Sequence, residues 1–243
     1  GCVEIYDDFI SKEESDLIIE QCEELGNNTI ISDWNWGVAH HGTEETDGKE
    51  SKYRTNDMLN ISSLACMPNG TAPHKALDQK QSLHLKDNMV SVHNMISSRL
   101  QSFVGDYCEK YKFNITFDEG YSILRYGVGQ EYKPHADYAE NLPRYLSALI
   151  LLNPSEYEGG GTYFNHFDEE IKPDKPSLAL FPANYAYTHQ ALPVISVSVE
   201  AHSLKLFKTP LFQVVSRVSS VSNTVDLNLL VSEFGSAFAK PKL

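Results

Sequence analysis

The stretch YSILRYGVGQEYKPHAD, residues 121–137, lies where the hydrophobic pattern of the chain changes. After Gly120, short runs rich in Tyr, Val, Leu and Ile alternate with clusters of Gly, Pro and Asn. Such alternation is typical of β-strands joined by turns. The runs that we predict as strands are residues 121–126, 145–152, 162–164, 177–181 and 204–207. We therefore expect a β-rich core over residues 120–208.

The first half of the chain has helical periodicity instead. Ser11, with Glu14 three residues later, forms a capping box that predicts a helix over residues 11–25, ended by Gly26. Apolar residues at helical spacing predict a second helix over residues 88–111. Helices followed by strands predict a mainly β fold with flanking helices (α+β), in which the helices pack outside a β-sandwich or barrel.

We expect one domain over residues 1–212, because a β-rich domain often reaches this size undivided. Its parts are a helical portion, residues 1–119, and the core, residues 120–208. Two polar segments, residues 40–57 and 67–80, predict surface loops near the mouth of the core. The remainder, residues 213–243, is a tail of open role, either an edge strand with a short helix or an appendage.

The composition excludes several kinds of partner. The net charge of -13 disfavours broad binding to nucleic acid and docking on an anionic membrane. The chain has no apolar run of about 18 residues, so we predict no transmembrane helix. Its first residues lack the features of a signal peptide, and we therefore expect a cytoplasmic protein. The sequence leaves the oligomeric state open.

His135-Ala136-Asp137 is the central motif for function. Residues two apart on a strand point to the same face, so one imidazole and one carboxylate can reach the same metal ion. His189 would complete a 2-His-1-carboxylate set, which is typical of non-haem Fe(II) oxygenases and leaves coordination positions open. The sequence thus predicts a metal site at His135, Asp137 and His189.

A second H-x-D motif, His166-Phe167-Asp168, competes with the first. It runs directly into an acidic segment and predicts a solvated turn. His189 also follows it too closely to leave room for the strands that would separate the ligands in a two-layered barrel. We therefore assign the metal site to the first motif.

The chain resembles the prolyl 4-hydroxylase-like family of Fe(II)/2-oxoglutarate-dependent dioxygenases over about residues 3–208. The segments that carry the resemblance are DDFISKEE (7–14), YGVGQEYKPHAD (126–137), RYLS (144–147), LLN (151–153), GGGTYF (159–164), LFP (180–182) and HQALPV (189–194). The resemblance implies a double-stranded β-helix, a cupin-like jelly-roll, with Fe(II) at one mouth. It further implies 2-oxoglutarate and O2 as co-substrates, ascorbate as an accessory cofactor, and hydroxylation of a C–H bond with decarboxylation of 2-oxoglutarate to succinate.

The chain departs from the family pattern at one position. The resemblance implies a Lys or Arg beyond the distal histidine, which would pair with the far carboxylate of 2-oxoglutarate, but Val199 stands there. Our candidates for this role are Lys205 first, His202 second and Arg125 third. Tyr126 and Tyr132 precede the metal ligands and are candidates to bind the co-substrate or to shape its pocket.

Three functional hypotheses remain open on the sequence alone. The first is a hydroxylase of a peptidyl proline or a similar residue, with a peptide or protein substrate. The second is a catalytically weak or inactive metal-binding jelly-roll, which the missing cation favours. The third is a hydroxylase of the same fold that acts on a small molecule such as a free amino acid.

Overall fold

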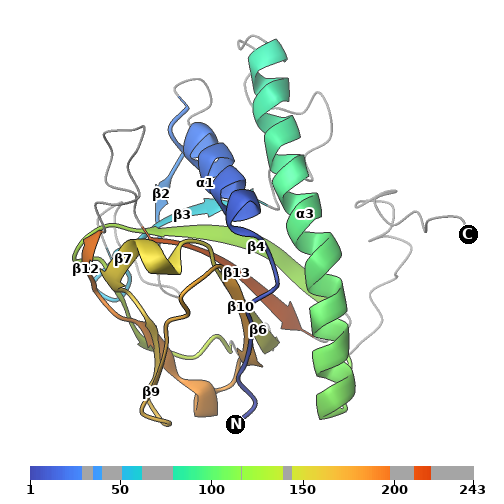
Figure 1. The fold of residues 1–243 in the computed structure, drawn as a ribbon, viewed down its shortest axis with the longest axis vertical. Coiled ribbons are helices and arrows are strands. Elements are labelled where there is room, and N and C mark those ends of the chain that lie inside the picture. The colour runs from blue at the N-terminus through green and yellow to red at the C-terminus, as the bar shows by residue number, and fades with distance from the viewer. Residues whose placement is uncertain are drawn as a thin grey trace, which may run out of the picture.

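The structure is a computed structural model that describes residues 1–28, 35–39, 51–61, 79–115, 117–138, 144–197 and 211–219. Two helices lie on one side of a large β-sheet (Figure 1). The helices are α1 (Lys12–Gly26) and α3 (Gln79–Tyr111). The strands are β1 (Glu4–Tyr6), β2 (Gly37–Val38), β3 (Asp57–Asn60), β4 (Phe117–Tyr126), β5 (Tyr132–His135), β6 (Arg144–Leu151), β7 (Tyr157–Gly159), β8 (Thr162–Phe164), β9 (Glu169–Ile171), β10 (Ser177–Pro182), β11 (His189–Ala191), β12 (Val194–Val197) and β13 (Leu211–Ser219).

Local sequence signals account for α1. The Ser11 side chain accepts a hydrogen bond from the Glu14 amide, and the Glu14 carboxylate accepts one from the Ser11 amide. This capping box confirms the predicted start of the helix. Ile18, Cys22 and Leu25 are fully buried on the face that packs into the core.

The helix α3 begins nine residues before its predicted start at Asn88. The predicted loop over residues 67–80 is therefore wrong at residues 79 and 80. The segment 79–87 is polar, but it contains no Gly or Pro and is rich in good helix formers. Met89, Val92 and Ile96 form the buried stripe of this helix. None of the helices that the structure describes is long and apolar enough to cross a membrane.

The strands form an antiparallel jelly-roll. The large sheet has the order β1-β10-β6-β13-β4-β3-β2, the smaller one has the order β5-β11-β8-β9, and β12 pairs with β7. Side chains of β6 alternate between two cores, as expected for a strand buried on both faces. Leu146, Ala148 and Ile150 pack toward the helices, whereas Leu149 and Leu151 pack toward the small sheet.

The strand β13 corrects two predictions about the C-terminal part. Residues 211–219 lie in the middle of the large sheet, hydrogen-bonded to β4 on one side and β6 on the other, and not at its edge. The sheet therefore extends past both the predicted core end at 208 and the predicted domain end at 212. The partners of this strand lie far away in sequence, where a local pattern cannot identify them. The predicted strand at 204–207 lies outside the described residues.

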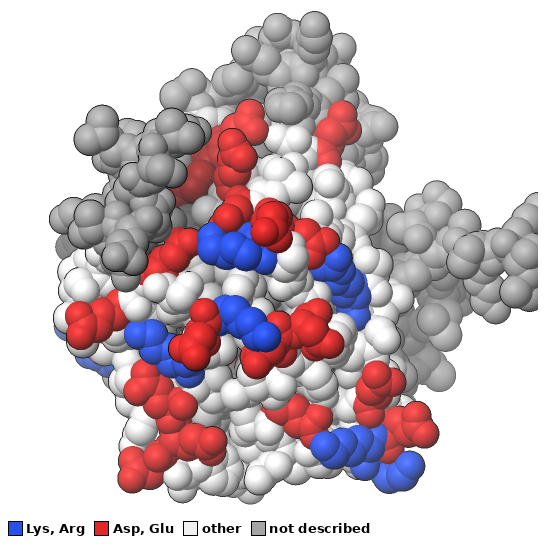
Figure 2. Space-filling view, viewed as in Figure 1, with Lys and Arg blue, Asp and Glu red and all other residues white. Residues whose placement is uncertain are grey.

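Acidic side chains are spread over the face seen in Figure 2, and the basic groups there lie beside acidic ones. Arg99 pairs with Glu14, and Lys12 pairs with both Asp16 and Glu156. The Arg99–Glu14 pair joins the two helices, and the Lys12–Glu156 pair joins α1 to the 3-10 turn Pro154–Glu156 before β7. The described residues on this face therefore form no broad basic surface.

Candidate metal centre

Strand pairing brings the two predicted histidine ligands together. His135 ends β5, His189 begins β11, and the two residues are direct partners in the antiparallel pair. Their ring centroids are 4.4 Å apart. Asp137 follows β5 in a bend, so the prediction that the whole H-x-D motif lies on a strand holds only for His135.

The three side chains direct their ligand atoms to one point. His135 Nε2 lies 3.9 Å from Asp137 Oδ1, and His189 Nε2 lies 3.7 Å from Asp137 Oδ2. All three residues offer a ligand atom within 4.8 Å of the others, and they are the one such group of His, Cys, Asp and Glu found in the described part of the chain. The separations are too long for hydrogen bonds and suit atoms that share a metal ion.

Backbone carbonyl groups orient both imidazoles. His135 Nδ1 lies 2.8 Å from Lys133 O, and His189 Nδ1 lies 3.0 Å from Tyr187 O. In each case the carbonyl is two residues earlier and accepts a hydrogen bond from the Nδ1–H tautomer. The Nε2 lone pair of each ring is then directed toward Asp137, as in metal sites whose ligands are held by outer hydrogen bonds.

Asp137 is held at two points. The Ser147 hydroxyl, on β6, donates to Asp137 Oδ2 at 2.7 Å, and both residues are buried. Arg144 Nη1 donates to the backbone carbonyl of Asp137 at 3.0 Å. The same guanidinium donates from Nε and Nη2 to the Glu119 carboxylate at 2.7–2.9 Å. None of these supporting roles was predicted from the sequence, although Ser147 is a polar residue inside an apolar strand, which is a signal for such a role.

A pocket opens beside the three ligands. Apolar side chains form most of its wall: Leu124, Leu149, Phe181 and Ala191. The two predicted tyrosines, Tyr126 and Tyr132, also line it and are buried. The Tyr132 ring stacks on the His135 ring, with centroids 3.6 Å apart and planes inclined by 17°. No Lys or Arg is among the lining residues in the described ranges.

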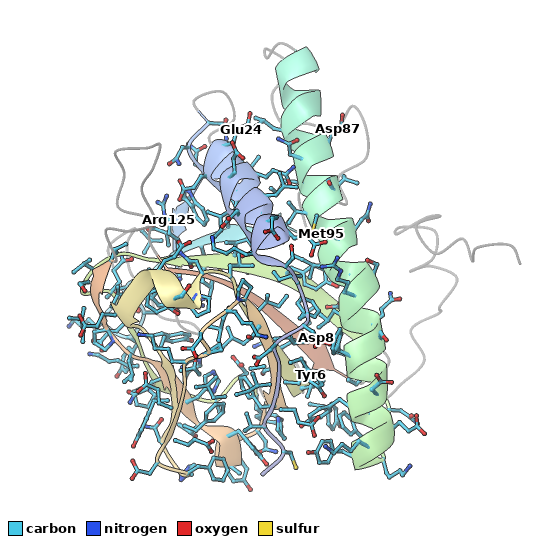
Figure 3. The ribbon with its side chains drawn as sticks, viewed as in Figure 1. Tyr6, Asp8, Glu24, Asp87, Met95 and Arg125 are labelled. Atoms are coloured by element: carbon cyan, nitrogen blue, oxygen red, sulfur yellow. The ribbon has the colours of Figure 1, made fainter. Side chains whose placement is uncertain are left out.

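Of the three predicted cationic partners of the co-substrate, only Arg125 is among the residues that the structure describes, and it does not line this pocket. Val199, His202 and Lys205 are outside the described residues. Arg125 points toward α1 (Figure 3), where it pairs with Asp57 at 2.7 Å and with Glu23 at 3.2 Å. Its guanidinium also lies over the Trp36 ring. Arg125 is therefore engaged on the helix side of the sheet and does not support its predicted role.

The second H-x-D motif occupies the turn between β8 and β9. Asp168 has a φ of 53° and accepts a hydrogen bond from the Tyr163 hydroxyl at 2.5 Å. His166 and Asp168 are exposed. This geometry agrees with the predicted solvated turn.

Comparisons with known proteins agree with the geometry. The sequence model of the 2OG-Fe(II) oxygenase superfamily matches residues 121–206. No curated protein matches the chain by sequence. Among solved structures, a viral collagen prolyl hydroxylase from Paramecium bursaria Chlorella virus-1, in a 2OG complex, has a TM-score of 0.53 at 18% identity, covering 91% of this chain and 97% of its own.

Two further structures have the same fold. A prolyl hydroxylase from Trichoplax adhaerens, in complex with a hypoxia inducible factor peptide fragment, has a TM-score of 0.52 at 15% identity, covering 89% of this chain and 83% of its own. A prolyl-4-hydroxylase from Pseudomonas putida has a TM-score of 0.50 at 14% identity, with coverage of 90% and 93%. The sequence match over residues 121–206 shows that this part of the chain is similar to the 2OG-Fe(II) oxygenase superfamily, and the chain shares its jelly-roll fold with solved prolyl hydroxylases.

Proposed function

We propose that the chain is an Fe(II)/2-oxoglutarate-dependent hydroxylase that binds its metal through His135 Nε2, the Asp137 carboxylate and His189 Nε2. The convergence of these three ligand atoms at the mouth of a mostly apolar pocket carries the proposal. Two neutral imidazoles and one carboxylate fit Fe(II), because this set leaves one face of an octahedral ion open. Fe(II), 2-oxoglutarate and O2 would supply the chemistry, in which one oxygen atom enters the substrate C–H bond and the other enters succinate as CO2 is lost.

The protein's own residues contribute orientation and exclusion of water. Lys133 O and Tyr187 O fix the two imidazoles, Ser147 holds the Asp137 carboxylate, and Arg144 holds the Asp137 backbone carbonyl. A preset ligand geometry avoids reorganisation when the metal binds. The walls formed by Leu124, Leu149 and Phe181 exclude water from the space beside the ligands, which limits side reactions.

We propose a peptide or protein as the substrate, with a prolyl residue as the site of hydroxylation. The support is the fold shared with prolyl hydroxylases, one of which holds a peptide fragment. A second candidate is a metal-binding jelly-roll with little or no turnover. It is favoured by the lack of Lys and Arg among the described residues that line the pocket, because a dianionic co-substrate binds weakly without a cationic partner.

The metal assignment is tested by replacing each ligand. We expect His135→Ala, Asp137→Ala and His189→Ala to abolish stoichiometric Fe(II) binding under anaerobic conditions, and the matched pair His166→Ala and Asp168→Ala to leave it unchanged. Metal analysis after loading and desalting gives the result. Equal iron loss in both sets would contradict the assignment.

Turnover separates the two candidate functions. Fe(II)-loaded protein with 2-oxoglutarate and ascorbate is assayed for succinate, with and without proline-containing peptides. Peptide-dependent succinate together with a mass gain of one oxygen on proline supports the hydroxylase. Stoichiometric iron without any succinate, with or without peptide or free amino acids, supports the metal-binding jelly-roll instead.

A further inference from the structure

Arg54 is a charged residue in a buried position beside the metal centre. It is 6% exposed and forms an isolated bridge with Tyr132, the first residue of β5. On either side of Arg54, backbone hydrogen bonds of 2.9 and 3.1 Å join Tyr53 and Thr55 to residues 131–133. Arg54 thus lies along the edge of β5 that β11 does not cover.

Arg54, Tyr132 and His135 are in contact in succession. Arg54 Cζ lies 4.6 Å from the centroid of the Tyr132 ring. The same ring stacks on the His135 imidazole, with a centroid distance of 3.6 Å. A guanidinium over an aromatic ring is attracted by the π electrons, and more strongly when both groups are removed from water. Tyr132 is 7% exposed and the His135 side chain 6%, so this condition is met.

The other contacts of Arg54 are few. Its Nε donates to Asn56 Oδ1 at 2.9 Å, and Asn56 is fully buried. No carboxylate pairs with Arg54 among the residues that the structure describes. The Tyr132 ring is therefore a principal contact of the Arg54 guanidinium, and the hydrogen bond to Asn56 orients the guanidinium over this ring.

We propose that Arg54 is a positioning residue of the metal centre: it holds the Tyr132 ring, and this ring sets the plane of the His135 imidazole. The proposal rests on the proposed role of His135 as a ligand. The hydrogen bond from His135 Nδ1 to Lys133 O holds one edge of the imidazole but still allows the ring to rotate about that bond. The Tyr132 ring, stacked face to face on the imidazole, prevents this rotation.

The sign of the effect distinguishes positioning from simple electrostatics. A positive charge near a divalent cation repels it, so a purely electrostatic Arg54 would weaken metal binding, and its removal would strengthen binding. A positioning Arg54 has the opposite effect, because its removal lets the stack loosen and weakens binding.

The experiment measures Co(II) affinity by competition with a chromophoric chelator, together with the visible Co(II) absorption that reports ligand geometry. We expect Arg54→Met to lower the affinity roughly 10-fold, within the range found for residues that support metal ligands, and to alter the absorption. Arg54→Lys retains the charge and should recover part of the affinity. Arg125→Met is the matched control, since Arg125 also stacks on an aromatic ring but lies on the helix side of the sheet, and it should leave Co(II) binding unchanged.

A double-mutant cycle tests the route through Tyr132. If Arg54 acts through the Tyr132 ring, Arg54→Met should have no further effect on Co(II) affinity in the Tyr132→Leu variant, which lacks the ring. Tighter Co(II) binding by Arg54→Met, or an undiminished effect of Arg54→Met in the Tyr132→Leu background, would overturn the proposal.

A metal-free measurement separates this proposal from the proposed function. In the metal-free protein at fixed pH, the stacked Tyr132 ring should shift the NMR signals of the His135 ring protons upfield, and Arg54→Met should reduce that shift. If wild type fails to bind Co(II) while this shift is present and sensitive to Arg54, the metal assignment fails and the stack stands. An unchanged shift in Arg54→Met refutes the positioning role regardless of metal.

Discussion

Replacing Ser147 by alanine tests how the centre holds its carboxylate ligand. The Ser147 hydroxyl donates to Asp137 Oδ2 at 2.7 Å, and Ser147 and Asp137 are only 1% and 5% exposed. A buried hydrogen bond to a charged group contributes about 1.5–3 kcal/mol, which is roughly 10- to 150-fold in an equilibrium constant. We expect Ser147→Ala to weaken Fe(II) or Co(II) binding by about 10- to 100-fold, because the carboxylate loses its preset orientation.

The assay is an anaerobic titration against a competing chelator, with unfolding by urea measured in parallel. Ser177→Ala is the matched control. Ser177 is also fully buried, and its hydroxyl also donates to a carboxylate, Asp7 Oδ1 at 2.9 Å, but it touches none of the metal ligands. Both variants should lose stability, and only Ser147→Ala should lose metal affinity. A folded Ser147→Ala protein that binds metal as tightly as wild type would refute the reasoning.

Three further predictions concern Arg144 at the metal centre and two positions elsewhere in the fold, Glu4 and Gly159. Arg144→Met removes the donor to the Asp137 carbonyl and should lower Co(II) affinity roughly 10-fold, with partial recovery in Arg144→Lys; no change would show that Ser147 alone suffices. Burial raises the pKa of Glu4, but hydrogen bonds from Lys110, Tyr6 and Tyr111 outweigh it and lower that pKa from 4.5 to about 2. The ionised Glu4 carboxylate therefore stabilises the folded protein fully above pH 4.5, and this contribution is lost as the pH falls toward 2. Glu4→Gln should lower the free energy of unfolding in urea by about 1–2 kcal/mol at pH 7, after solvent screening, but by almost nothing at pH 2. Gly159 has a φ of +73°, and an added Cβ would lie 2.4 Å from Pro193 O, so Gly159→Ala should destabilise by about 2 kcal/mol or more; a loss of less than about 0.5 kcal/mol would contradict that strain.

Local signals in the sequence predicted local structure well. The capping box of Ser11 and Glu14 marks the start of α1, and the alternating run at 162–164 coincides with β8. The two histidines were found because they stand in a spaced motif, and the structure places them opposite each other on paired strands. In each case the relevant information lies within a few residues or in a recognisable motif.

Features that depend on distant pairing were not predictable in the same way. The position of β13 is set by backbone partners on β4 and β6, and nothing within residues 211–219 names them. The supporting roles of Ser147 and Arg144 depend on the path of the chain between β5 and β6, which brings both residues to Asp137. Arg54 reaches Tyr132 from 78 positions earlier in the chain, through a bridge that no periodicity shows.

The central place of β13 has a consequence for how the chain is made. Synthesis proceeds from the N-terminus, so β4 and β6 leave the ribosome well before the strand that separates them. Until residues 211–219 arrive, both strands present unpaired N–H and C=O groups, which are templates for pairing with other chains. A polypeptide cut short at residue 208 would keep this opening permanently, and we expect it to aggregate where the longer chain stays in solution.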